Sequence, residues 1–235
     1  EGLDGDNQTI FLDCMTRSTD QLTTLRMVLW TRSLANAMPC KMECRVLGEE
    51  SKILSTAHFG ELPLPANCAQ FQLRLETKVG WTDWSQWLRW QSDELTEEFA
   101  VTFASTKSVA LILQRDPQGR RPVIHAPFWF TDTTGLGAKV MVEGNEGLEF
   151  DWDDATVCLM PPVVTPGQNN FQFDLTLGGE DHPPVTTSVP TLGAPTSVLL
   201  PPSYQAVLRT DRISAAETFG VHCRLICLLP KYVLF

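Results

Sequence analysis

Short apolar stretches, each about as long as one β-strand, recur along the whole chain and limit the folds open to it. In most of them apolar and polar side chains alternate, which is typical of a strand with one buried face. Strands this short and this numerous are typical of β-sandwiches and barrels, so the sequence predicts an all-β fold. Only residues 93–99, which follow the helix-capping residue Ser92, also fit a single helical turn. The predicted strands are residues 9–14, 25–30, 41–47, 71–77, 99–104, 109–114, 123–130, 138–143, 155–160, 171–177, 197–200, 204–210 and 221–228.

A repeated motif divides this pattern into modules. A strand that runs into a polar residue and then into a second strand occurs at 123–143, and similar motifs begin at residues 27 and 225, at intervals of about 100 residues. This period predicts tandem β-sandwich modules of about 100 residues each. The strand pattern interrupted at residue 235 indicates a fragment of a longer array. The expected segments are 1–20, unassigned, 21–126, the first module, 127–229, the second module, and 230–235, the start of a third.

Charge and motif content exclude several classes of function. The chain of 235 residues has 28 acidic and 18 basic residues, a net charge of −10, whereas a nucleic-acid-binding protein needs a basic surface. No apolar stretch approaches the roughly 18 residues of a membrane-spanning helix. The four histidines form no H-E-x-x-H motif, and the sequence contains no G-x-S-x-G motif or phosphate-binding loop. We therefore expect a protein without catalytic activity, cofactor or metal ion.

The cysteines favour a reducing compartment. There are seven, an odd number, and none forms a C-x-x-C pair. Cys40 and Cys44, and likewise Cys223 and Cys227, are four residues apart within strand patterns, which places each pair on one face of a strand. Buried, reduced thiols in a cytosolic protein are the favoured interpretation, and a metal site or disulfides are the alternative.

Three stretches resemble a known family. Residues 125–136 (HAPFWFTDTTGL) resemble the "aPyWiiNkTgL" signature of the vacuolar protein sorting thirteen family, which consists of bridge-like lipid transfer proteins. Residues 230–235 (PKYVLF) resemble the family's "PryvlvN", and residues 34–40 (LANAMPC) resemble its "l-N-lPc" form. The resemblance implies part of the family's adaptor-binding, or SHORT-ROOT-binding-like, domain, which is built of about six β-modules. This domain directs lipid transport to organelle membranes and membrane contact sites by binding Pro-x-Pro peptides of membrane-anchored adaptors. A cytoplasmic protein, peripheral at those membranes, is thus expected.

The resemblance also assigns site residues. Asn36 matches an asparagine characteristic of each module, and Asp132 occupies the matching position of the second module. An aspartate can reproduce only the hydrogen-bond-accepting half of an asparagine amide. Extended peptides bind readily to exposed sheet edges, and the stretch 221–235 is the expected peptide-accepting edge. Its candidate contact residues are Cys223, Leu225, Cys227 and Tyr232.

Four tryptophans spaced by three residues form the most unusual local motif, consisting of Trp81, Trp84, Trp87 and Trp90. The spacing resembles the ladder of thrombospondin type-1 repeats, in which Trp rings stack between Arg side chains. The cysteines of those repeats are missing between residues 79 and 98. We consider three interpretations, namely a packed aromatic strand and loop, an exposed contact patch for a partner or membrane interface, and a secreted or cell-surface adhesion module. A structural β-sandwich protein that assembles into oligomers is a further alternative.

Overall fold

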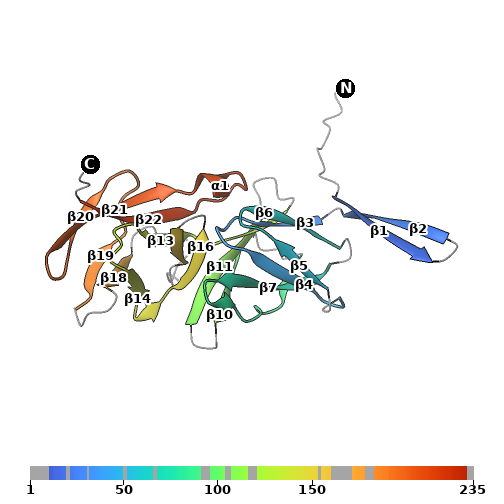
Figure 1. Ribbon diagram of the computed structural model, residues 1–235, viewed down its shortest axis with the longest axis horizontal. Coiled ribbons are helices and arrows are strands. Elements are labelled where there is room, and N and C mark those ends of the chain that lie inside the picture. Colours follow the sequence, from blue (N-terminus) through green and yellow to red (C-terminus); the bar gives the residue numbers. More distant parts are fainter. Residues whose placement is uncertain are drawn as a thin grey trace, which may run out of the picture.

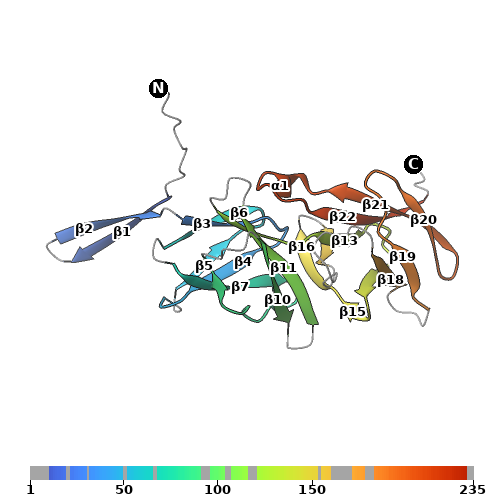
Figure 2. The ribbon, with the colours of Figure 1, turned by 180° about the vertical axis from the view of Figure 1, so that it is seen from behind.

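The computed structural model describes residues 11–19, 22–30, 32–49, 52–65, 68–90, 96–103, 107–115, 121–152, 155–159, 171–177 and 183–231. The predicted all-β fold is confirmed, because the regular structure of these residues is strand except for one helical turn, α1 (Ser214–Glu217). Two sandwiches lie side by side, and a hairpin of β1 (Phe11–Thr19) and β2 (Leu22–Trp30) extends beyond the first (Figures 1 and 2).

The first sandwich consists of two five-stranded sheets. Strands β3 and β12 are parallel, and every other described strand pair in this sandwich is antiparallel. One sheet has the order β10 (Thr96–Phe103), β11 (Lys107–Arg115), β12 (Pro122–His125), β3 (Arg32–Asn36), β6 (Gly60–Leu64). The other has the order β5 (Ile53–Thr56), β4 (Met42–Val46), β7 (Gln70–Thr77), β8 (Gly80–Trp81), and β9 (Leu88–Arg89) also pairs with β7.

The second sandwich repeats this arrangement with one strand more in one sheet and one strand fewer in the other. Its larger sheet has the order β16 (Leu148–Trp152), β17 (Ala155–Leu159), β13 (Phe128–Asp132), β22 (Arg224–Pro230), β21 (Tyr204–Arg212), β20 (Thr196–Leu200). Its smaller sheet has the order β15 (Asn145–Glu146), β14 (Ala138–Val142), β18 (Gln172–Leu177), β19 (Val185–Ser188). In both sandwiches the first strand, β3 or β13, runs parallel to the last strand, β12 or β22. The chain is therefore built of tandem β-sandwich modules, with β16 as an addition to the second.

The strands of the two modules occupy separate ranges of the chain. Those of the first sandwich lie within 32–125 and those of the second within 128–230, whereas 22–30 belong to the hairpin with β1. Of the residues expected to begin a third module, 232–235 lie outside the described part.

The repeated motif forms the junction between the modules. The sequence predicts one strand at 123–130, and this prediction is wrong, because β12 and β13 belong to different sandwiches and are separated by Ala126 and Pro127. Pro127 has no N–H to donate to a sheet and restricts the backbone of Ala126, which interrupts the strand. The carbonyl of Pro127 accepts a hydrogen bond from the N–H of Arg224 (2.9 Å), so the junction is tied to the last strand of the second module.

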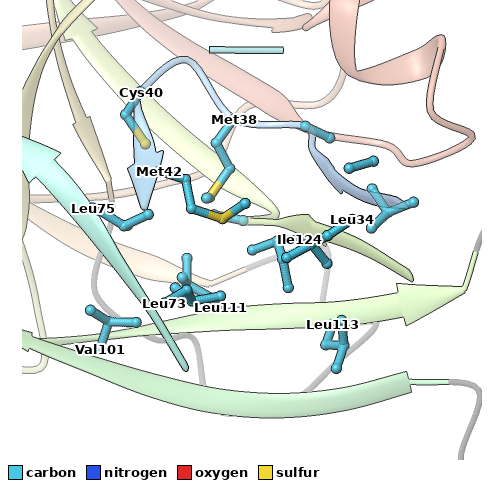
Figure 3. Close-up of a cluster of buried hydrophobic side chains, with 14 of the residues drawn as sticks. Leu34, Met38, Cys40, Met42, Leu73, Leu75, Val101, Leu111, Leu113 and Ile124 are labelled. Carbon is cyan, nitrogen blue, oxygen red and sulfur yellow. The ribbon is translucent and has the colours of Figure 1, made fainter. Parts of the chain in front are cut away.

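Alternate residues of β13 face two different cores. Phe128 and Phe130 are buried between the two sheets of the second module. Trp129 points the other way, into the cluster that fills the first module and continues between the modules. Figure 3 shows part of this cluster, with Met38, Met42, Leu34 and Leu73 among its buried side chains. Because both faces of β13 are buried, its sequence is a continuous apolar run rather than an alternating one.

Candidate functional site

Asn36 closes the turn after the first strand of the first module. Its side chain is fully buried. The Nδ2 atom donates hydrogen bonds to the carbonyls of Cys40 (2.7 Å) and Ala57 (3.0 Å), and Oδ1 accepts one from the N–H of Met38 (3.2 Å). Both N–H groups of the amide are used, so Asn36 fixes two segments of backbone and has no donor to offer a ligand.

Asp132 occupies the same place in the second module but only accepts hydrogen bonds, whereas Asn36 both donates and accepts. Its Oδ1 accepts hydrogen bonds from the N–H (2.8 Å) and the hydroxyl (2.5 Å) of Thr134, and Oδ2 accepts one from the N–H of Ala138 (2.8 Å). The carboxylate of Asp132 therefore accepts hydrogen bonds from two backbone N–H groups and one hydroxyl group of its turn. In each module the next residue, Ala37 or Thr133, donates its N–H to the last strand. The motif residues thus shape equivalent turns with different chemistry.

The predicted peptide-accepting edge is wrong for the residues that the structure describes. Strand β22 is central, since it pairs with β13 on one side and β21 on the other. Leu225 lies between Trp129 and Asp211, and Cys227 is buried. Cys223 is also buried, whereas Tyr232 lies outside the described residues. Apolar alternation marks a strand with a buried face but does not show whether its hydrogen-bonding edges are free.

Three of the four tryptophans form a ladder with two arginines. The guanidinium of Arg74 lies 4.9 Å from the ring centre of Trp81 and 4.6 Å from that of Trp84. The guanidinium of Arg45 lies 4.5 Å from Trp84 and 5.9 Å from Trp87. The order along this Trp–Arg ladder is Trp81, Arg74, Trp84, Arg45, Trp87. Its rings are half-buried, and cation–π contacts of this kind contribute about 0.5–1 kcal/mol each at exposed sites.

Trp90 stands apart from this ladder. It is buried in the core of the first module. The guanidinium of Arg32 lies 5.5 Å from its ring centre, and Phe71 makes an edge contact with it. The four residues predicted as one contact patch are therefore divided between the surface and the core.

The backbone of the ladder segment is attached to β7 at every third residue. The N–H of Thr82 donates to the carbonyl of Leu75 (2.9 Å), and the Thr82 hydroxyl accepts from the N–H of Leu75 (2.9 Å). Ser85 makes the same pair of bonds with Leu73. Hydroxyl oxygens thus replace the carbonyls of a normal neighbouring strand. This three-residue period places Trp81, Trp84 and Trp87 on the side of the chain away from the core and explains the spacing of these three residues in the sequence.

The two arginines of the ladder differ in their hydrogen-bond partners. Arg74 donates from both Nε (2.8 Å) and Nη2 (2.6 Å) to one carboxylate oxygen of Glu43. Arg45 donates from Nε to the neutral amide oxygen of Gln72 (2.8 Å). Gln72 in turn donates to the carbonyl of Ser85 (2.5 Å). Arg74 is therefore neutralised by a partner of its own, whereas Arg45 carries its charge beside an uncharged one.

The thiols and the buried histidine are held in their neutral forms. The six cysteines whose side chains the structure describes form no disulfide, and burial raises the pKa of the Cys223 thiol to about 12. Burial lowers the pKa of His125 to about 4, with a smaller contribution from His222. His125 Nδ1 lies 3.9 Å from Cys223 Sγ at the junction of the modules. At neutral pH this pair consists of a neutral imidazole and a protonated thiol, which lacks the thiolate that a nucleophile needs.

Two searches of the described residues give negative results. No group of three or more His, Cys, Asp or Glu side chains in this part of the chain could hold a metal ion. None of its helices is long and apolar enough to cross a bilayer.

Neither the models of known protein families nor the curated proteins match this chain. The resemblance to the vacuolar protein sorting thirteen family therefore rests on three short stretches, residues 34–40, 125–136 and 230–235.

Proposed function

We propose that the chain is a non-catalytic adaptor-binding segment of an intermembrane lipid transfer protein similar to the vacuolar protein sorting thirteen family. One observation carries the proposal. The two stretches that resemble the family's signature occupy equivalent places in two copies of one sandwich topology. Asn36 and Asp132 each end the first strand of a module and close the turn that follows.

The fold supports a role in binding extended peptides. Strands β6, β10 and β20 each lie at the end of a sheet among the described strands. Such edges can accept an extended segment through main-chain hydrogen bonds. A Pro-x-Pro segment favours the extended polyproline conformation, so it loses little entropy on binding. In the proposed function these peptides belong to membrane-anchored adaptors, and the protein is cytoplasmic and peripheral at organelle membranes and contact sites.

A fluorescence-anisotropy titration with labelled Pro-x-Pro peptides tests this function. We expect saturable binding to the full chain and loss of binding when both prolines of the peptide are replaced by Ala, because the replacement removes the preformed extended conformation. Circular dichroism of the same sample checks that the chain is folded. A folded chain that binds none of the peptides, or that binds the Ala controls equally well, contradicts the proposal.

A second candidate function is a secreted or cell-surface adhesion module. The Trp–Arg ladder favours it, because the rings of Trp81, Trp84 and Trp87 do alternate with Arg side chains. The lack of disulfides among the six cysteines whose side chains are described opposes it, since exposure to an oxidising compartment promotes disulfides. Intact-mass measurement of protein from its native source separates the two candidates. An adhesion module should carry hexose on tryptophan and have at most one free thiol, whereas the proposed adaptor-binding segment should carry no hexose and have free thiols throughout.

A further inference from the structure

We infer that Arg45 and the apolar side chains around it form a docking site for a carboxylate of an extended peptide partner. The inference rests on the proposed function and names the acidic residue that the captured peptide would carry. We call this surface the Arg45 site and define it by Arg45, Trp84, Trp87, Ile53 and Leu47.

The guanidinium of Arg45 has N–H groups available to bind a carboxylate, whereas the guanidinium of Arg74 already binds one. The Nε of Arg45 is bonded to Gln72, but Nη1 and Nη2 have no acceptor among the residues that the structure describes. Arg74, one step along the ladder, already holds the carboxylate of Glu43. The pair Arg74–Glu43 therefore shows, within this ladder, the interaction that Arg45 could make with a carboxylate from a partner.

Exposed aliphatic residues lie near Arg45 in the chain and in the sheet. Ile53 of β5 lies directly opposite Arg45 in the register of the sheet and is 48% exposed. Leu47 follows Arg45 by two residues, in the turn after β4, and is 49% exposed. An arginine stacked between aromatic rings in a region with exposed apolar residues is typical of a protein interface, where Trp and Arg are enriched.

The chemistry of the site selects one kind of occupant. An arginine fork matches the geometry of a carboxylate and can bind it through two N–H groups. The stacking of Arg45 between Trp84 and Trp87 fixes the orientation of the fork before a ligand arrives, which lowers the entropy cost of binding. Ile53 and Leu47 would cover apolar residues next to the acid. The predicted occupant is an extended peptide in which Asp or Glu adjoins apolar or proline residues.

The experiment compares peptides and variants in matched pairs. The probes are fluorescent peptides with an Ala-Pro-Leu-Pro-Ala core and a single Glu placed at successive flanking positions, each with a Gln counterpart. The variants are Ile53→Glu and Ile53→Gln. A side chain opposite Arg45 lies within about 5.5 Å of it, measured between Cβ atoms, so the glutamate of the first variant can occupy the fork from within the chain. The second variant removes the same isoleucine without adding a charge.

We expect at least one Glu peptide to bind the native chain about tenfold more tightly than its Gln counterpart, because a hydrogen bond to a charged group is stronger than a neutral one. This preference should persist in Ile53→Gln and disappear in Ile53→Glu, and high salt should reduce it. Both variants should melt at the native temperature, since residue 53 is at the surface.

Two kinds of failure are distinguishable. If the Gln peptides bind but no Glu position improves binding, or if Ile53→Glu keeps the preference, the Arg45 site is overturned and the proposed function stands. If a folded chain binds no Pro-x-Pro peptide of either series, the proposed function is overturned and the Arg45 site with it.

Discussion

Trp129→Ala is expected to lower the free energy of unfolding by about 3–5 kcal/mol, the range observed when a large aromatic side chain is removed from a core. Trp129 is fully buried and makes an edge contact with Phe150, with ring centres 5.5 Å apart. Its side chain belongs to the cluster that the two modules share. The cavity would therefore open between the modules as well as beneath one sheet. Urea unfolding followed by circular dichroism measures the loss.

The shape of the unfolding curve adds a second result. The shared cluster should make the native modules unfold together, and Trp129→Ala should separate the transition into two steps, because the contact that couples them is weakened. Trp129→Phe is the matched control. The indole N–H of Trp129 is buried without a hydrogen-bond partner among the described residues, so the phenyl ring loses apolar area but removes that unpaired donor. A Trp129→Ala protein that unfolds in one step, with less than about 1 kcal/mol of destabilisation, would contradict this account.

Strand-forming segments could be predicted from the sequence because alternation has a direct physical cause. The stretch 71–77 alternates apolar and polar residues and coincides with β7, whose two faces meet the core and the ladder. The repeated motif likewise predicted tandem modules from its period alone. Strand β3 at 32–36 and strand β19 at 185–188 were not predicted, since their short runs contain few large apolar residues. The helical turn considered for 93–99 is wrong from Thr96 onward, where β10 begins.

Pairing could not be predicted from the same patterns. The period of a strand shows which side chains are buried but not which neighbours complete its hydrogen bonds. Strand β22 therefore looked like an edge although β13 and β21 flank it. The helical turn α1 has only four residues, which are too few to show the 3.6-residue periodicity of a helix in the sequence.

The candidate site could be predicted only in part, for a related reason. The spacing of Trp81, Trp84, Trp87 and Trp90 resembled a ladder, but the sequence did not distinguish a ladder from a packed aromatic strand and loop. The arginines between them come from β4 and β7, far away in the sequence. The sheet register brings Arg45 and Arg74 to one face, and their hydrogen bonds show that Arg45 lacks an acidic partner among the described residues.

Asn36→Ala is expected to cost about 3–5 kcal/mol of stability. The substitution leaves two carbonyls, of Cys40 and Ala57, and the N–H of Met38 without the bonds that Asn36 provides. Each buried polar group left unpaired costs about 1–3 kcal/mol. Asp132→Ala should cost less, about 1–2 kcal/mol, because Asp132 is only half-buried and water can replace a carboxylate there. Thermal and urea unfolding of both variants measure the difference.

The variants Asn36→Asp and Asp132→Asn change which hydrogen bonds the side chain can make while keeping its size almost the same. Asn36→Asp places a carboxylate oxygen against the two carbonyls that now accept from Nδ2, so it should destabilise at least as much as Asn36→Ala. Asp132→Asn keeps one acceptor for Thr134 and should cost less than Asn36→Asp. If both substitutions lower the free energy of unfolding by equal and small amounts, the result would contradict the assignment of a donating role to Asn36 and an accepting role to Asp132. If peptide binding by Asn36→Ala falls only in proportion to its unfolded fraction, Asn36 acts through the fold of the first module, as expected for an amide with no donor left to offer a ligand.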